Sequence, residues 1–380
     1  MTAPNLLDFG LDGDQEARAR RLHDECIIFD GMNQHPGGAR IFDELPADWL
    51  HDHLGSLGPW EAIGTAGQLP YLAMAEGLSD AIERWWRESG VDVGSLAVST
   101  NLSAGDGEID ASVVTQFDWI ELVTTAAQIR KNKANGIISL WGVDQPTMGI
   151  PNTLDSVDDA YGRGLRSLML TYNRMDFVGT GCTERYDAGL SMYGLDVVRR
   201  CNELGIIVDT SHCGRRTTLD ACEYSSTPVI ANHTSAAGLF AHARGKDDDT
   251  IRALAATGGM VAMVTVPFFM AKEPRPRLDV VLDHVEYVAG LVGVDHVGLG
   301  TDWPMQIPID VVASTLGEVL PSIGFRPEDN IDVTATFDGF DDYREFVNIT
   351  RGLVARGWSD EDIAKVLGEN FLRVIETVCG

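Results

Sequence analysis

Short runs of apolar residues recur along the chain, and most are followed by a stretch with helical periodicity. The helical stretches include Leu195–Leu204 and Thr250–Ala256. Continuous apolar strands that alternate with helices are typical of a parallel sheet covered on both faces. Seven such strands, with an eighth that has no clear position, predict an α/β fold with a closed (β/α)8 barrel. The seven runs are Cys26–Phe29, Gly136–Leu140, Ser167–Thr171, Ile206–Asp209, Pro228–Ala231, Gly259–Thr265 and His296–Gly300.

The region from about Pro36 to Thr115 does not follow this alternation. It contains Gly, Pro and several Trp residues, with a helical pattern over Ser79–Glu88 that carries Trp85 and Trp86. We predict a long insertion between the first strand and the first barrel helix, lying over the barrel mouth. Alternatively, the tryptophans only pack this insertion onto the barrel. A final helix over residues 360–378 is expected to close the barrel, so that residues 1–380 form one domain.

The charge of the chain restricts its partners. Fifty-seven acidic and 29 basic residues give a formal net charge of −28. This field repels nucleic acids and anionic membranes, so neither is an expected partner. No run approaches the roughly 18 apolar residues of a membrane span, and the first residues do not resemble a secretory signal. Six cysteines without CxxC spacing suit reduced thiols, so we expect a cytoplasmic protein.

Three metal-ligand types stand directly after predicted strands. They are His212, His233 and Asp302, each at the end of a different strand. Carboxyl ends of barrel strands converge at one mouth, so these side chains are expected to meet there. Two imidazoles and a carboxylate can hold zinc, whose bound water becomes a nucleophile near neutral pH. Each histidine alone would be read as a hydrogen-bonded residue of the barrel rim.

Arg244 follows His233 on the next loop. An arginine near the mouth of so acidic a protein suggests a fork that binds a substrate carboxylate. The alternative is a surface ion pair with the acidic run Asp247–Asp249.

These residues lie within longer strings that resemble the membrane (renal) dipeptidase family, of the peptidase M19 type. The similarity runs from about Gly136 to the C-terminus, with a weaker match at the first strand. It is carried by the block Leu170–Gly214, by PVIANHTSAAGLFAHARGKDDDTIRALAATGGMVAM, by HVGLGTDW and by LGENFLRV. The resemblance implies a TIM-like barrel of the amidohydrolase kind, commonly a homodimer.

The resemblance also implies a pair of zinc ions in the family. His212 and His233 match the two histidines that hold one ion, and Asp302 matches the late aspartate of the other. Arg244 matches the arginine that binds the substrate carboxylate.

Four family positions are changed in this chain. Met32 and Gln34 stand where the His-x-Asp pair of the family belongs, and Trp141 replaces the bridging glutamate. Tyr172 replaces the polarising histidine. A thioether is a poor zinc ligand, a carboxamide is weak and an indole is none. We therefore expect one zinc ion rather than two, with metal identity open and a metal-free site as an alternative.

Other residues could replace the lost ligands or contact substrate. His35 and Asp144 are candidate additional ligands. His51 and His53 in the insertion are a further source, although a solvated loop is the simpler interpretation. Substrate contacts are expected from Trp141 by stacking and from Tyr172, Gln34 and Asn173 by hydrogen bonds. Tyr172 and Asp302 are also candidates for acid/base catalysis, although a tyrosine of ordinary pKa is a weak acid.

Three functions remain open on these residues. The first is a metal-dependent hydrolase with a reduced, mononuclear site, acting on a small carboxylate-bearing amide, dipeptide-like or lactone substrate. The second is a lyase, decarboxylase or isomerase on the same barrel, with one metal or none. The third is a non-catalytic relative that binds a small molecule. Ordinary dipeptidase activity is doubtful because a metal pair is not expected.

Overall fold

The computed structural model describes residues 4–33, 45–54, 69–97, 111–146, 149–302, 320–332 and 335–380. Among the described residues, its sheet has eight strands, which run parallel in every pairing. The order is β1-β3-β4-β5-β6-β7-β8, and β2 pairs with β3 outside this path. The strands are β1 (Val93–Ala97), β2 (Ile120–Val123), β3 (Ile138–Asp144), β4 (Leu165–Met169), β5 (Ile207–Asp209), β6 (Val229–Thr234), β7 (Val261–Met263) and β8 (Val297–Leu299).

A short extended segment next to β1 joins the two ends of this order. Phe29 forms a parallel bridge with Val93 of β1. On the other side, the Gly31 N–H donates to the Leu299 carbonyl of β8 over 2.9 Å. This segment corresponds to the predicted first strand, Cys26–Phe29, and its contacts complete the ring. The predicted barrel is therefore confirmed.

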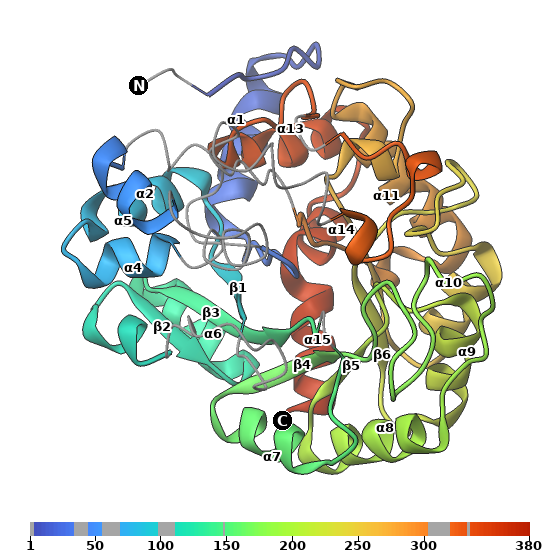
Figure 1. Cartoon of the computed structure of the whole chain (residues 1–380). Helices are drawn as coiled ribbons and strands as arrows, with labels where there is room; N and C mark the ends of the chain where they lie inside the picture. Colours follow the sequence, from blue (N-terminus) through green and yellow to red (C-terminus); the bar gives the residue numbers. More distant parts are fainter. Residues whose placement is uncertain are drawn as a thin grey trace.

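Helices surround the sheet, mostly following the strands in the chain (Figure 1). Apolar residues three or four positions apart face the strands, as in Val197, Val198 and Cys201 of α8, which are all fully buried. The α-helices are α1 (Gly13–Glu25), α2 (Ala47–Leu54), α4 (Leu69–Ala75), α5 (Ser79–Ser89), α6 (Ala126–Asn135), α7 (Asp155–Gly162), α8 (Met192–Leu204), α9 (Arg215–Tyr224), α10 (Asp248–Ala256), α11 (Asp279–Val292), α13 (Val347–Ala355), α14 (Asp360–Ala364) and α15 (Asn370–Val378). No helix of the described residues is both long and apolar enough to cross a membrane.

The final helix packs against the interior of the ring, as predicted. A π-helical turn, Lys365–Glu369, joins α14 to α15. Phe371 of α15 stacks on Phe29 with ring centroids 4.4 Å apart, and both belong to a buried cluster with Trp141 and Met32. Figure 1 shows α15 between β1 and β6 in the middle of the molecule. Aromatic packing of this kind fixes the base on which the barrel mouth is built.

The predicted insertion is shorter than the sequence suggested. Within the range 36–115, Val93–Ala97 forms β1, which is the barrel strand that had no clear position in the sequence. Its sequence, VGSLA, carries little of the β-branched content that marks the other strands. Its pairing with β3 over five residues supplies what local propensity does not.

The tryptophans of this region pack inward. Trp85 and Trp86 on α5 are 2% and 0% exposed. The Trp86 indole N–H donates to the Val91 carbonyl over 2.8 Å, and the Arg344 guanidinium lies 4.0 Å from the Trp85 ring. The packing interpretation of these two residues is therefore confirmed.

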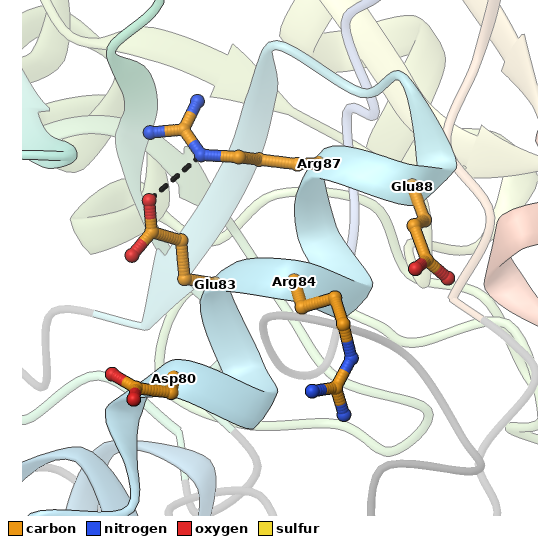
Figure 2. Close-up of a pocket in the computed structure, with 5 residues that line it drawn as sticks. All are labelled: Asp80, Glu83, Arg84, Arg87 and Glu88. Atoms are coloured by element: carbon orange, nitrogen blue, oxygen red, sulfur yellow. Dashed lines mark hydrogen bonds and ion pairs between the residues drawn. The ribbon is translucent and has the colours of Figure 1, made fainter.

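A shallow hollow on the outer surface of α5 is lined by charged side chains. Figure 2 shows that they all project from this one helix, with an ion pair of 2.7 Å between Arg87 and Glu83. None of the strand-end residues lines it. The lining residues are Asp80, Glu83, Arg84, Arg87 and Glu88.

Candidate active site at the barrel mouth

Two histidines meet at the ends of β5 and β6. His212 lies three residues after β5, and His233 is part of β6. Their Nε2 atoms are 3.0 Å apart, and the side chains are buried. The structure thus brings together these two of the three predicted ligand residues.

Two asparagines fix which nitrogen of each ring carries a proton. The Asn232 amide donates to the Gly31 carbonyl, so its Oδ1 faces His233 Nδ1 and accepts from it. Asn173 Oδ1 accepts from His212 Nδ1 over 2.7 Å. Both Nδ1 atoms are therefore donors, and the lone pairs of both Nε2 atoms point toward the same place.

The charges around this pair keep the rings neutral. Burial lowers the pKa of His212 well below its ordinary value, and the nearby Arg244 guanidinium lowers it further. Burial and Arg244 have the same effect on the pKa of His233. Neutral imidazole is the form that binds metal ions.

Tyr172 stacks on this pair. Its ring lies 4.1 Å from that of His212, with 19° between the planes. The side chain is half-buried, and burial raises the pKa of its hydroxyl, an effect that the nearby Asp302 carboxylate increases. Tyr172 therefore stays protonated at neutral pH and can donate a hydrogen bond, but it is not a base.

Asp302 follows β8 in an unusual backbone conformation. Its φ is 52°, in the left-handed region, and its N–H donates to the Met32 carbonyl over 2.7 Å. Non-glycine residues in this region are uncommon and are enriched where function requires a particular side-chain direction. This turn brings the Asp302 carboxylate within electrostatic range of Tyr172.

Arg244 does not form the surface ion pair considered from the sequence. It is 1% exposed, its Nη1 donates to the Ser211 carbonyl, and its Nη2 donates to the His233 carbonyl over 3.2 Å. Arg215 instead pairs with Asp247 and Asp249. Arg244 Nε has no acceptor among the described residues, so a buried cationic donor remains at the mouth.

The opposite side of the mouth is apolar. Met32 and Trp141 are both 3% exposed, and Trp141 meets Phe29 edge to face with centroids 6.4 Å apart. Both side chains pack into one buried cluster. We call Met32, Trp141 and Gln145 the methionine side, and His212, His233 and Arg244 the histidine side.

Gln145 is a residue of this mouth that the sequence reasoning missed. It is the first residue after β3, and its Nε2 lies 3.0 Å from Met32 Sδ and 3.5 Å from His233 Nε2. Its place directly after a strand was the only available signal.

A group of polar side chains around the buried Asp30 was also not predicted from the sequence. Its carboxylate accepts from Thr301 Oγ1 over 2.6 Å and from Tyr343 Oη over 2.9 Å. Asn33 Nδ2 donates to the same Tyr343 hydroxyl. Burial raises the pKa of Asp30 to about 7, although the hydrogen bonds from Thr301 and Tyr343 lower it. Tyr343 belongs to no sequence motif, so its role appears only in the fold.

The remaining predicted positions are placed as follows. Gln34 and His35 lie outside the described residues. Asp144 ends β3 and is 8% exposed. His51 and His53 lie on α2, where His53 is 3.4 Å from Glu76.

The donor chemistry of the mouth decides what metal it fits. Among the described residues, no group of three or more His, Cys, Asp and Glu side chains is arranged to hold an ion. Two neutral imidazoles with convergent lone pairs nevertheless fit one zinc-type ion on the histidine side. The methionine side offers a thioether, an indole and a carboxamide, which do not fit a second ion.

Sequence comparison supports the same family. The model of the membrane dipeptidase family, peptidase family M19, matches residues 108–320 and 309–379. Dipeptidase verJ of Clonostachys rogersoniana is 29% identical over 267 residues, which is 69% of this chain and 61% of the relative. Dipeptidase tcpJ of Claviceps purpurea is 31% identical over 191 residues, 50% of this chain and 39% of the relative. The chain thus spans less than two thirds of the length of these curated relatives.

Solved structures share the whole fold. An amidohydrolase from Pseudomonas aeruginosa is 25% identical, with a TM-score of 0.72 over 95% of this chain and 99% of that one. A metallopeptidase from Rhodobacter sphaeroides, bound to a phosphinate mimic of the dipeptide L-Ala-D-Ala, has a TM-score of 0.64 at 19% identity, over 93% of this chain and 100% of that one. The family model covers more than half of the chain, and this protein therefore belongs to the membrane dipeptidase family, peptidase family M19.

Proposed function

We propose that this protein is a metal-dependent hydrolase with a mononuclear site, acting on a small carboxylate-bearing amide, dipeptide-like or lactone substrate. The observation that carries the proposal is the pair of His212 and His233, whose Nε2 lone pairs converge at 3.0 Å. Two lone pairs at this distance repel each other unless a cation or a proton lies between them. His212, His233 and Asp302 would hold one zinc ion, which supplies an activated water when bound.

The side chains around the pair would bind and orient the substrate. Arg244 supplies a buried cation whose Nε lacks a protein acceptor among the described residues, which suits a substrate carboxylate. The Asn173 Nδ2 group is also buried without such an acceptor and can donate to a substrate carbonyl. Tyr172 would donate through its protonated hydroxyl, and Asp302 would accept a proton. Trp141 and Gln34 remain proposed substrate contacts.

The direct test combines metal analysis with an activity screen. Protein purified without chelators should carry about one equivalent of zinc, and His212→Ala and Asp302→Ala should lose it. The same variants should lose hydrolysis of a panel of dipeptides, N-acyl amino acids and lactones. Two equivalents in the wild type would contradict the mononuclear site. Retention of zinc and activity in His212→Ala would reject the proposal.

A second candidate is an acid/base lyase, decarboxylase or isomerase on the same barrel. It is favoured by the protonated Tyr172 stacked on a neutral His212 next to Asp302. In this case, activity would survive full chelation and would fall in Tyr172→Phe. Full loss on chelation with recovery on added zinc would reject it.

We also propose a cytoplasmic homodimer with one domain per chain and a small-molecule substrate. The net charge of −28 argues against nucleic acids and anionic membranes as partners. Light scattering of the purified protein should give twice the 41.3 kDa chain mass. The mass of one chain would contradict the dimer.

A further inference from the structure

Gln145 connects the methionine side of the barrel mouth to the histidine side. It follows β3 directly and is half-buried. Its Nε2 is 3.0 Å from Met32 Sδ and 3.5 Å from His233 Nε2. A carboxamide nitrogen carries two hydrogens, so one can point to the thioether and the other to the imidazole. The side chain thus links a residue that replaced a metal ligand to one that was retained.

The tautomer of His233 determines what Gln145 does there. His233 Nδ1 donates to Asn232, so Nε2 carries only a lone pair. A lone pair that accepts a hydrogen bond is not free to bind a metal ion. The separation of 3.5 Å is at the long end of hydrogen bonding, so a cation can displace the amide at a modest cost. The cost of displacement would appear as weaker metal binding.

Nearby positive charges also oppose the binding of a cation at His233. Arg244 is a buried cation whose Nη2 donates to the His233 carbonyl over 3.2 Å. Lys246 is buried, and its Nζ donates to the carbonyls of Thr210 and Cys213. A neutral amide does nothing to offset this positive field, whereas a carboxylate at the same position would.

We propose that Gln145 limits metal binding at this mouth by competing for His233 Nε2 and by holding the methionine side without a second cation. The inference rests on the proposed metal at His212 and His233. It adds that the amide of Gln145 sets the zinc affinity and the number of ions. A single change to glutamate replaces the donor by a zinc ligand. A change to leucine removes the donor and adds no ligand.

Zinc titration of the full chain tests this role. The protein is stripped with a chelator, and zinc affinity is measured by competition with a chelating dye. Stoichiometry is measured by elemental analysis after equilibrium dialysis. Gln145→Glu should bind zinc about 10- to 100-fold more tightly than the wild type. Gln145→Leu should bind about fivefold more tightly because one competing hydrogen bond is removed.

A matched control separates this effect from added negative charge. Gln15 accepts from the Asp12 N–H in the cap of α1, and a glutamate keeps that acceptor. Gln15→Glu adds the same charge at the start of α1, which supplies none of the residues of the mouth, so it should leave zinc affinity unchanged. Thermal unfolding without zinc shows whether each variant is folded. If Gln145→Glu does not fold, Gln145→Leu decides the result.

The outcomes distinguish this inference from the proposed function. Equal zinc affinity in the wild type and both Gln145 variants, or weaker binding in Gln145→Leu, overturns the role of Gln145. If that occurs while the wild type still carries zinc and hydrolyses amides, the proposed function stands. If the wild type binds no zinc and Gln145→Glu binds it, the role of Gln145 is supported and the metal-dependent function is rejected.

Discussion

Different forces hold the side chains on the histidine side and on the methionine side of the barrel mouth. On the histidine side, each ring nitrogen of His212 and His233 has a polar neighbour, and Arg244 is bound to backbone carbonyls. On the methionine side, Met32 and Trp141 belong to one buried apolar cluster, in which Trp141 meets Phe29 edge to face. Hydrogen bonds hold one side and apolar packing holds the other, so we expect the two sides to respond to substitution in different ways.

Removal of the indole from the methionine side should have the largest effect on stability. Trp141→Ala should lower the free energy of unfolding by about 3–5 kcal/mol because it leaves a cavity next to Phe29. Zinc affinity should change much less, since His212 and His233 keep their partners. Urea unfolding and zinc titration measure the two quantities. Trp49→Ala, at a half-buried residue of α2, is the control and should cost less. A large loss of zinc affinity with little loss of stability would reverse the comparison.

Removal of the Asn232 carboxamide, which contacts His233 on the histidine side, should act mainly on metal binding. Asn232→Ala leaves His233 Nδ1 without the acceptor that fixes its tautomer. Zinc affinity should fall about 10- to 100-fold. Asn202→Ala removes an amide that bonds to Ser225 and Thr227 instead, and it should leave zinc affinity unchanged. Equal zinc affinity in both variants would show that the tautomer is not fixed by Asn232.

The buried carboxyl beneath the methionine side should make stability depend on pH. Burial raises the folded pKa of Asp30 to about 7, so the folded protein binds a proton that the unfolded chain releases near pH 4. Its contribution to stability is therefore present below pH 4 and is lost as pH rises to about 7. The free energy of unfolding of the wild type, relative to Asp30→Asn, should fall by about 3–4 kcal/mol across this range. A flat difference between pH 4 and 7 would disprove this assignment.

The smallest effect is expected at Tyr172. Tyr172→Phe keeps the ring stacked on His212 and removes only the hydroxyl donor. The free energy of unfolding should change by less than about 1 kcal/mol, and kcat/KM for any substrate found should fall about fivefold. Steady-state kinetics at neutral pH measure the second value. A loss of a thousandfold or more would instead identify the hydroxyl as the main proton donor.

The sequence predicted most of the barrel because most of its strands are apolar runs that can be recognised locally. Apolar runs near β3 to β8 were recognised from their own residues, and the final helix was recognised from its periodicity. β1 and β2 were both missed. The residues of β1 have little strand propensity and depend on Phe29 and β3 for their pairing, and β2 has only four residues. The same limit made the insertion look longer than it is.

The candidate site shows where local information ends. Residue type and position after a strand were enough to predict that His212 and His233 meet. They could not show that Gln145 reaches across to Met32 and His233, or that Tyr343 donates to Asp30. The sequence alone determined the parallel barrel and the residue types at its mouth, since both follow from periodicity and strand order. Only the tertiary structure decided which lone pairs converge and that Arg244 Nε has no acceptor among the described residues, because these depend on contacts between residues far apart in the chain.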